Sequence, residues 1–179
     1  KGIEVTLVLQ PIKERPKIKY MGYVDLIIYD KSTEEYTIFD IKTSTKGWSK
    51  WEKGDETKHQ QLYLYKQFYS ELFKVPLDKI NVEFYIVKRK VLSFDDENIK
   101  SPHQAYRVQN FRPTDNRKRL KKAKEDFTGF IRECYTAEGN PIDREFEKIV
   151  GKPCDWCDFG KNRELCGAAL APEEKFFSF

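Results

Sequence analysis

The chain has 179 residues, 39% of them hydrophobic and 15% aromatic, which suits one globular domain with a substantial core. A net charge of +4 excludes a polycation, although 35% of the residues are charged. No apolar run approaches the roughly 20 residues that cross a bilayer, and no secretory leader opens the chain. We therefore expect a cytoplasmic protein without a membrane partner, in the host cytoplasm if it is viral.

Hydrophobic periodicity predicts an α/β domain with a mixed central sheet flanked by helices. Alternation of apolar and polar residues indicates half-buried strands, and apolar residues at helical spacing indicate amphipathic helices. A polar hairpin turn is expected at 30–35 and a loop at 44–55. Strands are expected at 3–9, 18–29, 36–43, 79–88 and 104–111, and helices at 57–73, from Thr114 or Asp115 to Cys134, and from Asn140 to Val150. The domain is expected to span 1–150, with a cysteine-containing segment at 151–179 packing on it.

Two carboxylates and a lysine form the most informative cluster. Asp40 and Lys42 lie two apart on one predicted strand, so their side chains emerge on the same face. The hairpin should bring Asp25 beside that face. Burying these charges among apolar residues is costly without compensation. A divalent cation supplies it, because Mg²⁺ accepts one or two carboxylates plus water and phosphate oxygens.

The order of these motifs resembles the PD-(D/E)XK nuclease superfamily, RecB-like branch. The resemblance rests on Gly22 to Asp25, on Asp40-Ile41-Lys42, and on a helix with Gln61 and Tyr65, over residues 18–90. It implies a restriction-endonuclease-like core and a DNA nuclease that uses Mg²⁺ or Mn²⁺ in replication, recombination or repair, including those of a phage.

The resemblance also implies roles for single residues. Asp25, Asp40 and the backbone carbonyl of Ile41 would bind the metal, and Lys42 would be the catalytic lysine. Gln61 would touch the substrate or that lysine. Many members carry a further acidic residue before the first strand, and Glu4 is the substitute available here.

Cysteines crowd into the last third of the chain. Cys154, Cys157 and Cys166 offer three thiolates, a set typical of a Zn²⁺ or Fe–S site. They resemble the cysteine triplet of Fe–S-bearing RecB-like nucleases. Cys134 could complete the set, or lie in the helix core as a small apolar residue. The sequence does not decide between Fe–S, zinc and no metal.

Aromatic and basic residues after the catalytic strand suit a DNA strand with unpaired bases or ends, since rings stack on bases and cations hold phosphates. A basic run on the last long helix could follow a DNA backbone or be a solvated face. The expected DNA contacts are Tyr65, Trp48, Trp51, Lys46, Arg117, Lys118 and Lys121. Tyr65 and the tryptophans could instead pack into the fold.

Three functions stay open at this point. The first is a metal-dependent deoxyribonuclease, exo- or endonucleolytic, with a helicase or recombination protein as its partner. The second is a DNA-binding module of the same fold without catalysis. The third is a metal-stabilised interaction domain of a larger assembly, in which the cysteines matter and the acidic cluster does not.

Overall fold

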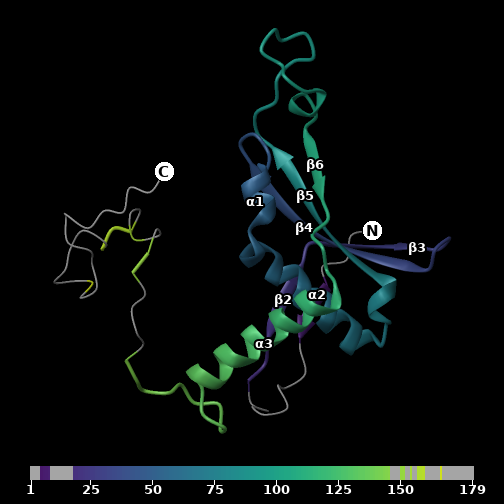
Figure 1. Ribbon diagram of the computed structural model, residues 1–179. Coiled ribbons are helices and arrows are strands. Elements are labelled where there is room, and N and C mark those ends of the chain that lie inside the picture. Colours follow the sequence, from purple (N-terminus) through teal and green to yellow (C-terminus); the bar gives the residue numbers. More distant parts are fainter. Residues whose placement is uncertain are drawn as a thin grey trace. The chain divides into compact units, whose positions relative to one another are not determined.

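Figure 1 shows a computed structural model of the chain. It describes residues 18–145, 150–151, 154, 157–159 and 166, together with the backbone of 5–8. The chain forms two compact units, residues 1–142 and 143–179. The helices and strands named below lie in the first unit. Within the described residues, no helix is both long and apolar enough to cross a membrane.

The first unit contains a mixed four-stranded sheet in the order β3-β4-β5-β6 (Figure 1). The central pair β4–β5 is parallel and both outer pairs are antiparallel. A separate antiparallel pair, β1–β2, precedes it. The strands are β1 (Val5–Val8), β2 (Met21–Val24), β3 (Leu26–Asp30), β4 (Glu35–Ser44), β5 (Ile80–Lys88) and β6 (Val108–Phe111).

The described part of this unit also contains three α-helices and two short 3₁₀ turns. Since parallel neighbours need a crossover, the segment with α1 and α2 connects β4 to β5. The Asp55 side chain caps α2 by accepting from the Thr57 amide, and Lys74 ends this helix in the left-handed conformation. The elements are α1 (Lys50–Gly54), α2 (Glu56–Phe73), η1 (Leu77–Lys79), η2 (Pro102–Gln104) and α3 (Arg117–Cys134).

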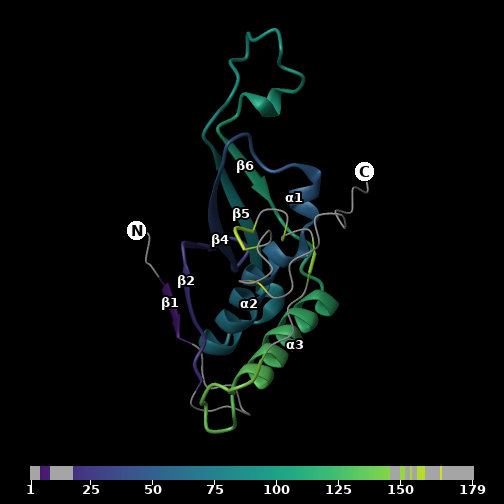
Figure 2. The same cartoon turned by 90° about the vertical axis from the view of Figure 1, so that its left-hand side faces the viewer.

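Helix α2 lies between the sheet and α3, which explains why most of its circumference is buried. One side packs on the inward side chains of β4 and β5 through Leu62, Tyr65 and Tyr69. The opposite side meets α3, where Tyr63 contacts Leu120 and Ala123. Figure 2 shows α3 running alongside α2. The sheet and α2 therefore form the frame of the core.

The predicted strands at 36–43 and 79–88, the helix at 57–73 and the turn before β4 are confirmed. The predicted strand at 18–29 was wrong in two respects. It starts only at Met21, and it breaks at Asp25 so that its halves join different sheets. The expected loop at 44–55 contains α1. Its start was readable, because Ser49 and Glu52 form a capping box.

Three further expectations are corrected. The strand at 104–111 begins only at Val108, because Ser101 caps a 3₁₀ turn through Gln104. Helix α3 is capped by Asn116, not by Thr114 or Asp115. No helix starts at Asn140. The chain turns at Gly139, with φ +85°, and Pro141 bridges to Tyr135. Residues 3–4, 9, 11–17 and 146–149 lie outside the described part.

Candidate active site

Asp25 lies at the break between β2 and β3. The β3–β4 ladder ends at the pair Leu26–Phe39, which places Asp25 opposite Asp40. The ladder offers no further strand partner to the Ile41 amide, and Asp25 Oδ2 accepts its hydrogen bond at 2.7 Å. Asp25 is exposed, so the expectation of a buried Asp25 was wrong. The bond holds its carboxylate at the edge of β4.

Asp40 is the buried carboxylate of the site, with 3% of its surface exposed. It pairs in register with Phe84 of β5 and faces α2. Burial raises the pKa of this carboxyl, the hydrogen bond and charge of Lys42 oppose the rise, and the charge of Asp25 adds to it. The neighbouring cation therefore offsets part of the cost of a charged carboxylate in an apolar setting.

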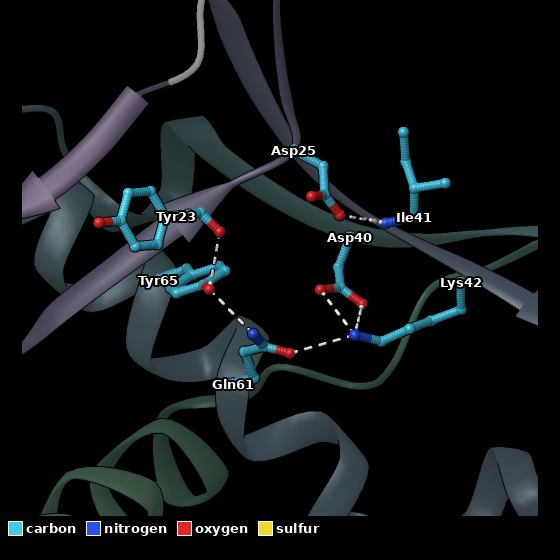
Figure 3. A network of polar contacts seen from close by, with 7 residues as sticks. All are labelled: Tyr23, Asp25, Asp40, Ile41, Lys42, Gln61 and Tyr65. Carbon is cyan, nitrogen blue, oxygen red and sulfur yellow. Dashed lines mark hydrogen bonds and ion pairs between the residues drawn. The ribbon is translucent and has the colours of Figure 1, made fainter.

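Lys42 meets the two oxygens of Asp40 differently (Figure 3). Its Nζ donates to Oδ1 at 3.0 Å and lies 2.8 Å from Oδ2 as an ion pair. The second contact lacks hydrogen-bond geometry, so Oδ2 is a buried acceptor without a hydrogen-bond donor among the described groups. The Lys42 ammonium compensates the charge on this oxygen, and the lone pairs of Oδ2 stay open to a further positive group.

Gln61 and Tyr65 extend the network from α2 (Figure 3). Tyr65 Oη donates to the Tyr23 carbonyl at 2.8 Å and accepts from Gln61 Nε2 at 2.9 Å. The Gln61 amide is thereby turned so that its Oε1 accepts from Lys42 Nζ at 3.3 Å. The spacing of four residues on a helix puts both side chains on the sheet-facing side.

Glycine at position 22 makes room for this network. A Cβ at Gly22 would lie 2.6 Å from Cε1 of Tyr65, well inside van der Waals contact. The Tyr65 ring is 3% exposed and belongs to the main core cluster. This side chain therefore orients its neighbours from within the core, which differs from the expected DNA contact.

The remaining predicted contacts divide by exposure. Trp48 packs on Phe84, with ring centroids 4.7 Å apart. The backbone amide of Trp48 donates to Gln109 Oε1, and its carbonyl accepts from Gln109 Nε2. Trp51, by contrast, is 89% exposed. Lys46 is exposed, as are Arg117 and Lys118. Lys121 pairs with Glu125 at 3.5 Å. Nothing in the sequence marked Gln109, which ties the loop after β4 to the sheet.

None of the four cysteines forms a disulfide. Cys134 ends α3 and is half-buried, whereas Cys154, Cys157 and Cys166 belong to the second unit. The Cys157 amide donates to the Cys154 carbonyl at 3.3 Å, a turn within the Cys-x-x-Cys segment. Most residues around them lie outside the described part, so the cysteine site stays a prediction. The same holds for Glu4.

A divalent cation fits the Asp25–Asp40 edge through its donor chemistry. Two carboxylates and the Ile41 carbonyl are oxygen donors of the kind that Mg²⁺ and Mn²⁺ take, with water and phosphate completing the shell. The buried Oδ2 of Asp40 lacks a hydrogen bond and suits such a contact. Among the described residues, no group of three or more His, Cys, Asp or Glu side chains is arranged to hold a metal ion.

His59 is a further buried titratable group, 3% exposed and beside Phe84 and Phe111. Burial lowers its pKa, helped by the charge of Arg119. Below pH 6.5 the unfolded chain takes up a proton that folded His59 resists, so stability should fall as the pH drops towards 5. In urea unfolding at pH 7, 6 and 5, we expect the free energy of unfolding of His59→Phe to depend less steeply on pH than that of the wild type. The difference in slope should correspond to at most one proton. His103→Gln, which alters an exposed histidine, is the control, and an unchanged slope in His59→Phe would contradict the assignment.

Comparison with known proteins gives one match. The family model described as the PD-(D/E)XK nuclease superfamily matches residues 3–166, most of the chain. None of the curated proteins and none of the solved structures matches significantly.

Proposed function

This chain belongs to the PD-(D/E)XK nuclease superfamily, and from that premise we propose that it is a metal-dependent deoxyribonuclease centred on Asp25, Asp40 and Lys42. The observation that carries the proposal is the Asp40–Lys42 pair. A buried carboxylate pairs with a lysine, and an exposed carboxylate lies opposite it across the strand pair. The expected fold, a mixed sheet flanked by helices, agrees with this family.

Asp25, Asp40 and the Ile41 carbonyl would hold the cation. Members of the superfamily typically use Mg²⁺ or Mn²⁺. When bound, such an ion polarises the scissile phosphate and lowers the pKa of a bound water. Asp40 offers it the oxygen that lacks a hydrogen bond, while the bond from the Ile41 amide limits the positions that Asp25 can take.

Lys42 would act on the reacting phosphate directly. An ammonium has three N–H donors, and the Asp40 and Gln61 contacts use two of them. The third is free to reach a phosphate oxygen or the attacking water, since the Lys42 side chain is 39% exposed. Hydrolysis joins the water oxygen to phosphorus and breaks one P–O ester bond, and the positive charge stabilises the negative charge that develops in between.

We further propose a cellular process and a partner for this activity, and a structural metal site at the cysteines. The reaction would serve DNA replication, recombination or repair, in a phage or a cell, beside a helicase or recombination protein. A Zn²⁺ or Fe–S cluster at Cys154, Cys157 and Cys166 would clamp the second unit structurally. Metal analysis and the absorption spectrum of anaerobically purified protein would identify such a cluster, and the absence of bound metal would contradict it.

The direct test is cleavage of end-labelled single-stranded and duplex DNA with Mg²⁺ or Mn²⁺, beside EDTA. An exonuclease would release the labelled terminal nucleotide or give a ladder that shortens stepwise from the unlabelled end. An endonuclease would give internal cleavage products. Binding without cleavage under both metals would instead identify a DNA-binding module of the same fold.

Tyr65→Phe should lower the cleavage rate about tenfold while leaving the metal ligands in place. Without the hydroxyl, the Gln61 amide loses the acceptor that sets its orientation, and it can turn its NH₂ towards the Lys42 ammonium. The Tyr23 carbonyl also loses its donor, which costs about 1 kcal/mol of stability. Single-turnover rates and urea unfolding measure the two effects.

Tyr69→Phe is the matched control, because Tyr69 also lies on the core side of α2 but outside this hydrogen-bond chain. A Tyr65→Phe rate equal to that of Tyr69→Phe would show that the hydroxyl does not orient Gln61.

A further inference from the structure

The connection from β5 to β6 is long for a compact domain. It spans residues 89–107, and Figures 1 and 2 both show it projecting beyond the ends of the two strands. Connections longer than about 12–15 residues usually carry a function. We call residues 89–107 the β5–β6 finger.

Polar contacts within the finger give it a defined conformation. Ser101 and Gln104 form a capping box around η2, and the Leu92 amide donates to the Gln104 carbonyl at 3.1 Å. At the base, the Arg107 guanidinium donates to the carbonyls of Lys88 and Arg89 at 2.9 and 3.1 Å. The backbone of the finger is therefore held by internal hydrogen bonds, which favours a binding role over that of a slack linker.

The base of the finger is joined to the catalytic strand. The Arg89 amide donates to the Ser44 carbonyl and the Lys90 amide to the Thr45 carbonyl, both at 2.8 Å. Thr45 lies three residues after Lys42, which corresponds to about 10 Å along a strand. A nucleic acid strand leaving the active site in this direction meets the finger within a few nucleotides.

Two aromatic rings project from the finger into solvent. Phe94 is 61% exposed and Tyr106 is 50% exposed. They pack edge to face with centroids 5.7 Å apart, and neither belongs to the core clusters. Such rings are suited to stacking on unpaired bases, because every base offers a π face.

Charge is distributed unevenly along the finger. Arg89, Lys90 and Arg107 lie at its base, whereas Asp95, Asp96 and Glu97 follow Phe94. Phosphates are attracted to the base and repelled from the acidic stretch. A nucleic acid strand would thus contact the base through its backbone and the aromatic pair through a base.

We propose that the β5–β6 finger binds an unpaired DNA strand next to the active site, with Phe94 and Tyr106 stacking on a base and Lys90 holding a phosphate. The identity of the ligand as DNA rests on the proposed nuclease function. The finger would make the enzyme prefer single-stranded or frayed substrates over blunt duplexes.

The test measures binding separately from cleavage. Fluorescence anisotropy in EDTA compares a single-stranded oligonucleotide with the blunt duplex of the same sequence, over a range of salt concentrations. The variants are Phe94→Ala/Tyr106→Ala and Lys90→Gln. Phe130→Ala is the control, since it removes a ring of similar exposure from α3. Thermal melting checks that each variant folds.

We expect the double variant to bind the single strand at least about fivefold more weakly, with little change for the duplex. Lys90→Gln should reduce the slope of log K against log salt by about 0.7. Equal single-strand binding by the double variant and the control would overturn the proposal, as would a wild type that binds no single strand.

Cleavage assays run in parallel separate this proposal from the nuclease function. Ring-dependent binding without metal-dependent cleavage would support the finger and contradict the nuclease. Cleavage together with binding that does not depend on the rings would do the reverse.

Discussion

Lys42→Ala should reduce metal-dependent DNA cleavage by on the order of 10²–10³-fold, the typical loss when one preorganised charge is removed from a reacting centre. Two effects combine. The variant removes the ammonium that can meet the phosphate, and it removes the group that opposes the rise in the pKa of Asp40. The remaining activity of the variant should therefore rise with pH, and the pH at which it rises should be higher than in the wild type.

Single-turnover cleavage over a pH series measures both effects. Lys31→Ala is the control, because Lys31 is exposed in the β3–β4 turn, at the other end of the hairpin. If Lys42→Ala lowers the activity by the same factor at every pH, the proposed effect of Lys42 on the pKa of Asp40 is contradicted. Full activity in Lys42→Ala would contradict the assignment of the catalytic lysine.

Asp40→Asn should abolish cleavage and also the stabilisation that Mn²⁺ brings. A ligand at 100 times its Kd stabilises a protein by about 2.7 kcal/mol, which raises the Tm of a chain of this size by about 5–10 °C. The wild type should show such a shift at saturating Mn²⁺. Asparagine keeps the shape of the side chain but lacks the charge that attracts the cation.

Without added metal, Asp40→Asn should be at least as stable as the wild type at pH 7. The pKa of Asp40 is raised in the folded protein, so folding disfavours its charged form. This penalty is present above the folded pKa and disappears as the pH falls towards 3.8. The advantage of the variant should therefore shrink in acid.

Differential scanning fluorimetry with and without Mn²⁺ tests both parts of this prediction. Asp78→Asn, at an exposed carboxylate in η1, should keep the full metal shift. A full shift in Asp40→Asn would place the cation elsewhere and leave the buried carboxylate with a structural role.

The variants at Asp40 and Lys42 and the variants in the finger change different parts of the proposed DNA-binding surface. Asp40 and Lys42 concern the phosphate that reacts, whereas Phe94, Tyr106 and Lys90 concern the strand beyond it. Independent losses in the two sets would be additive, because the groups share no contact among the described interactions.

Local periodicity was enough to determine which side chains of the site share a face. Asp40 and Lys42 lie two apart on a strand, and Gln61 and Tyr65 lie four apart on a helix. These spacings follow from the geometry of strand and helix, so no knowledge of neighbouring elements was required. The sequence therefore predicted the acidic edge, the lysine and the helix that faces them.

Only the tertiary structure decided what each of these groups contacts. Asp25 bonds to the Ile41 amide because the sheet changes at that residue, and Trp48 is packed in the core while Trp51 is exposed. The direction of the Gln61 amide depends on the Tyr65 hydroxyl, which donates its own hydrogen bond to the Tyr23 carbonyl and therefore accepts from Gln61. Periodicity assigns a residue to a face, but burial and hydrogen-bond direction depend on partners brought together from distant parts of the chain.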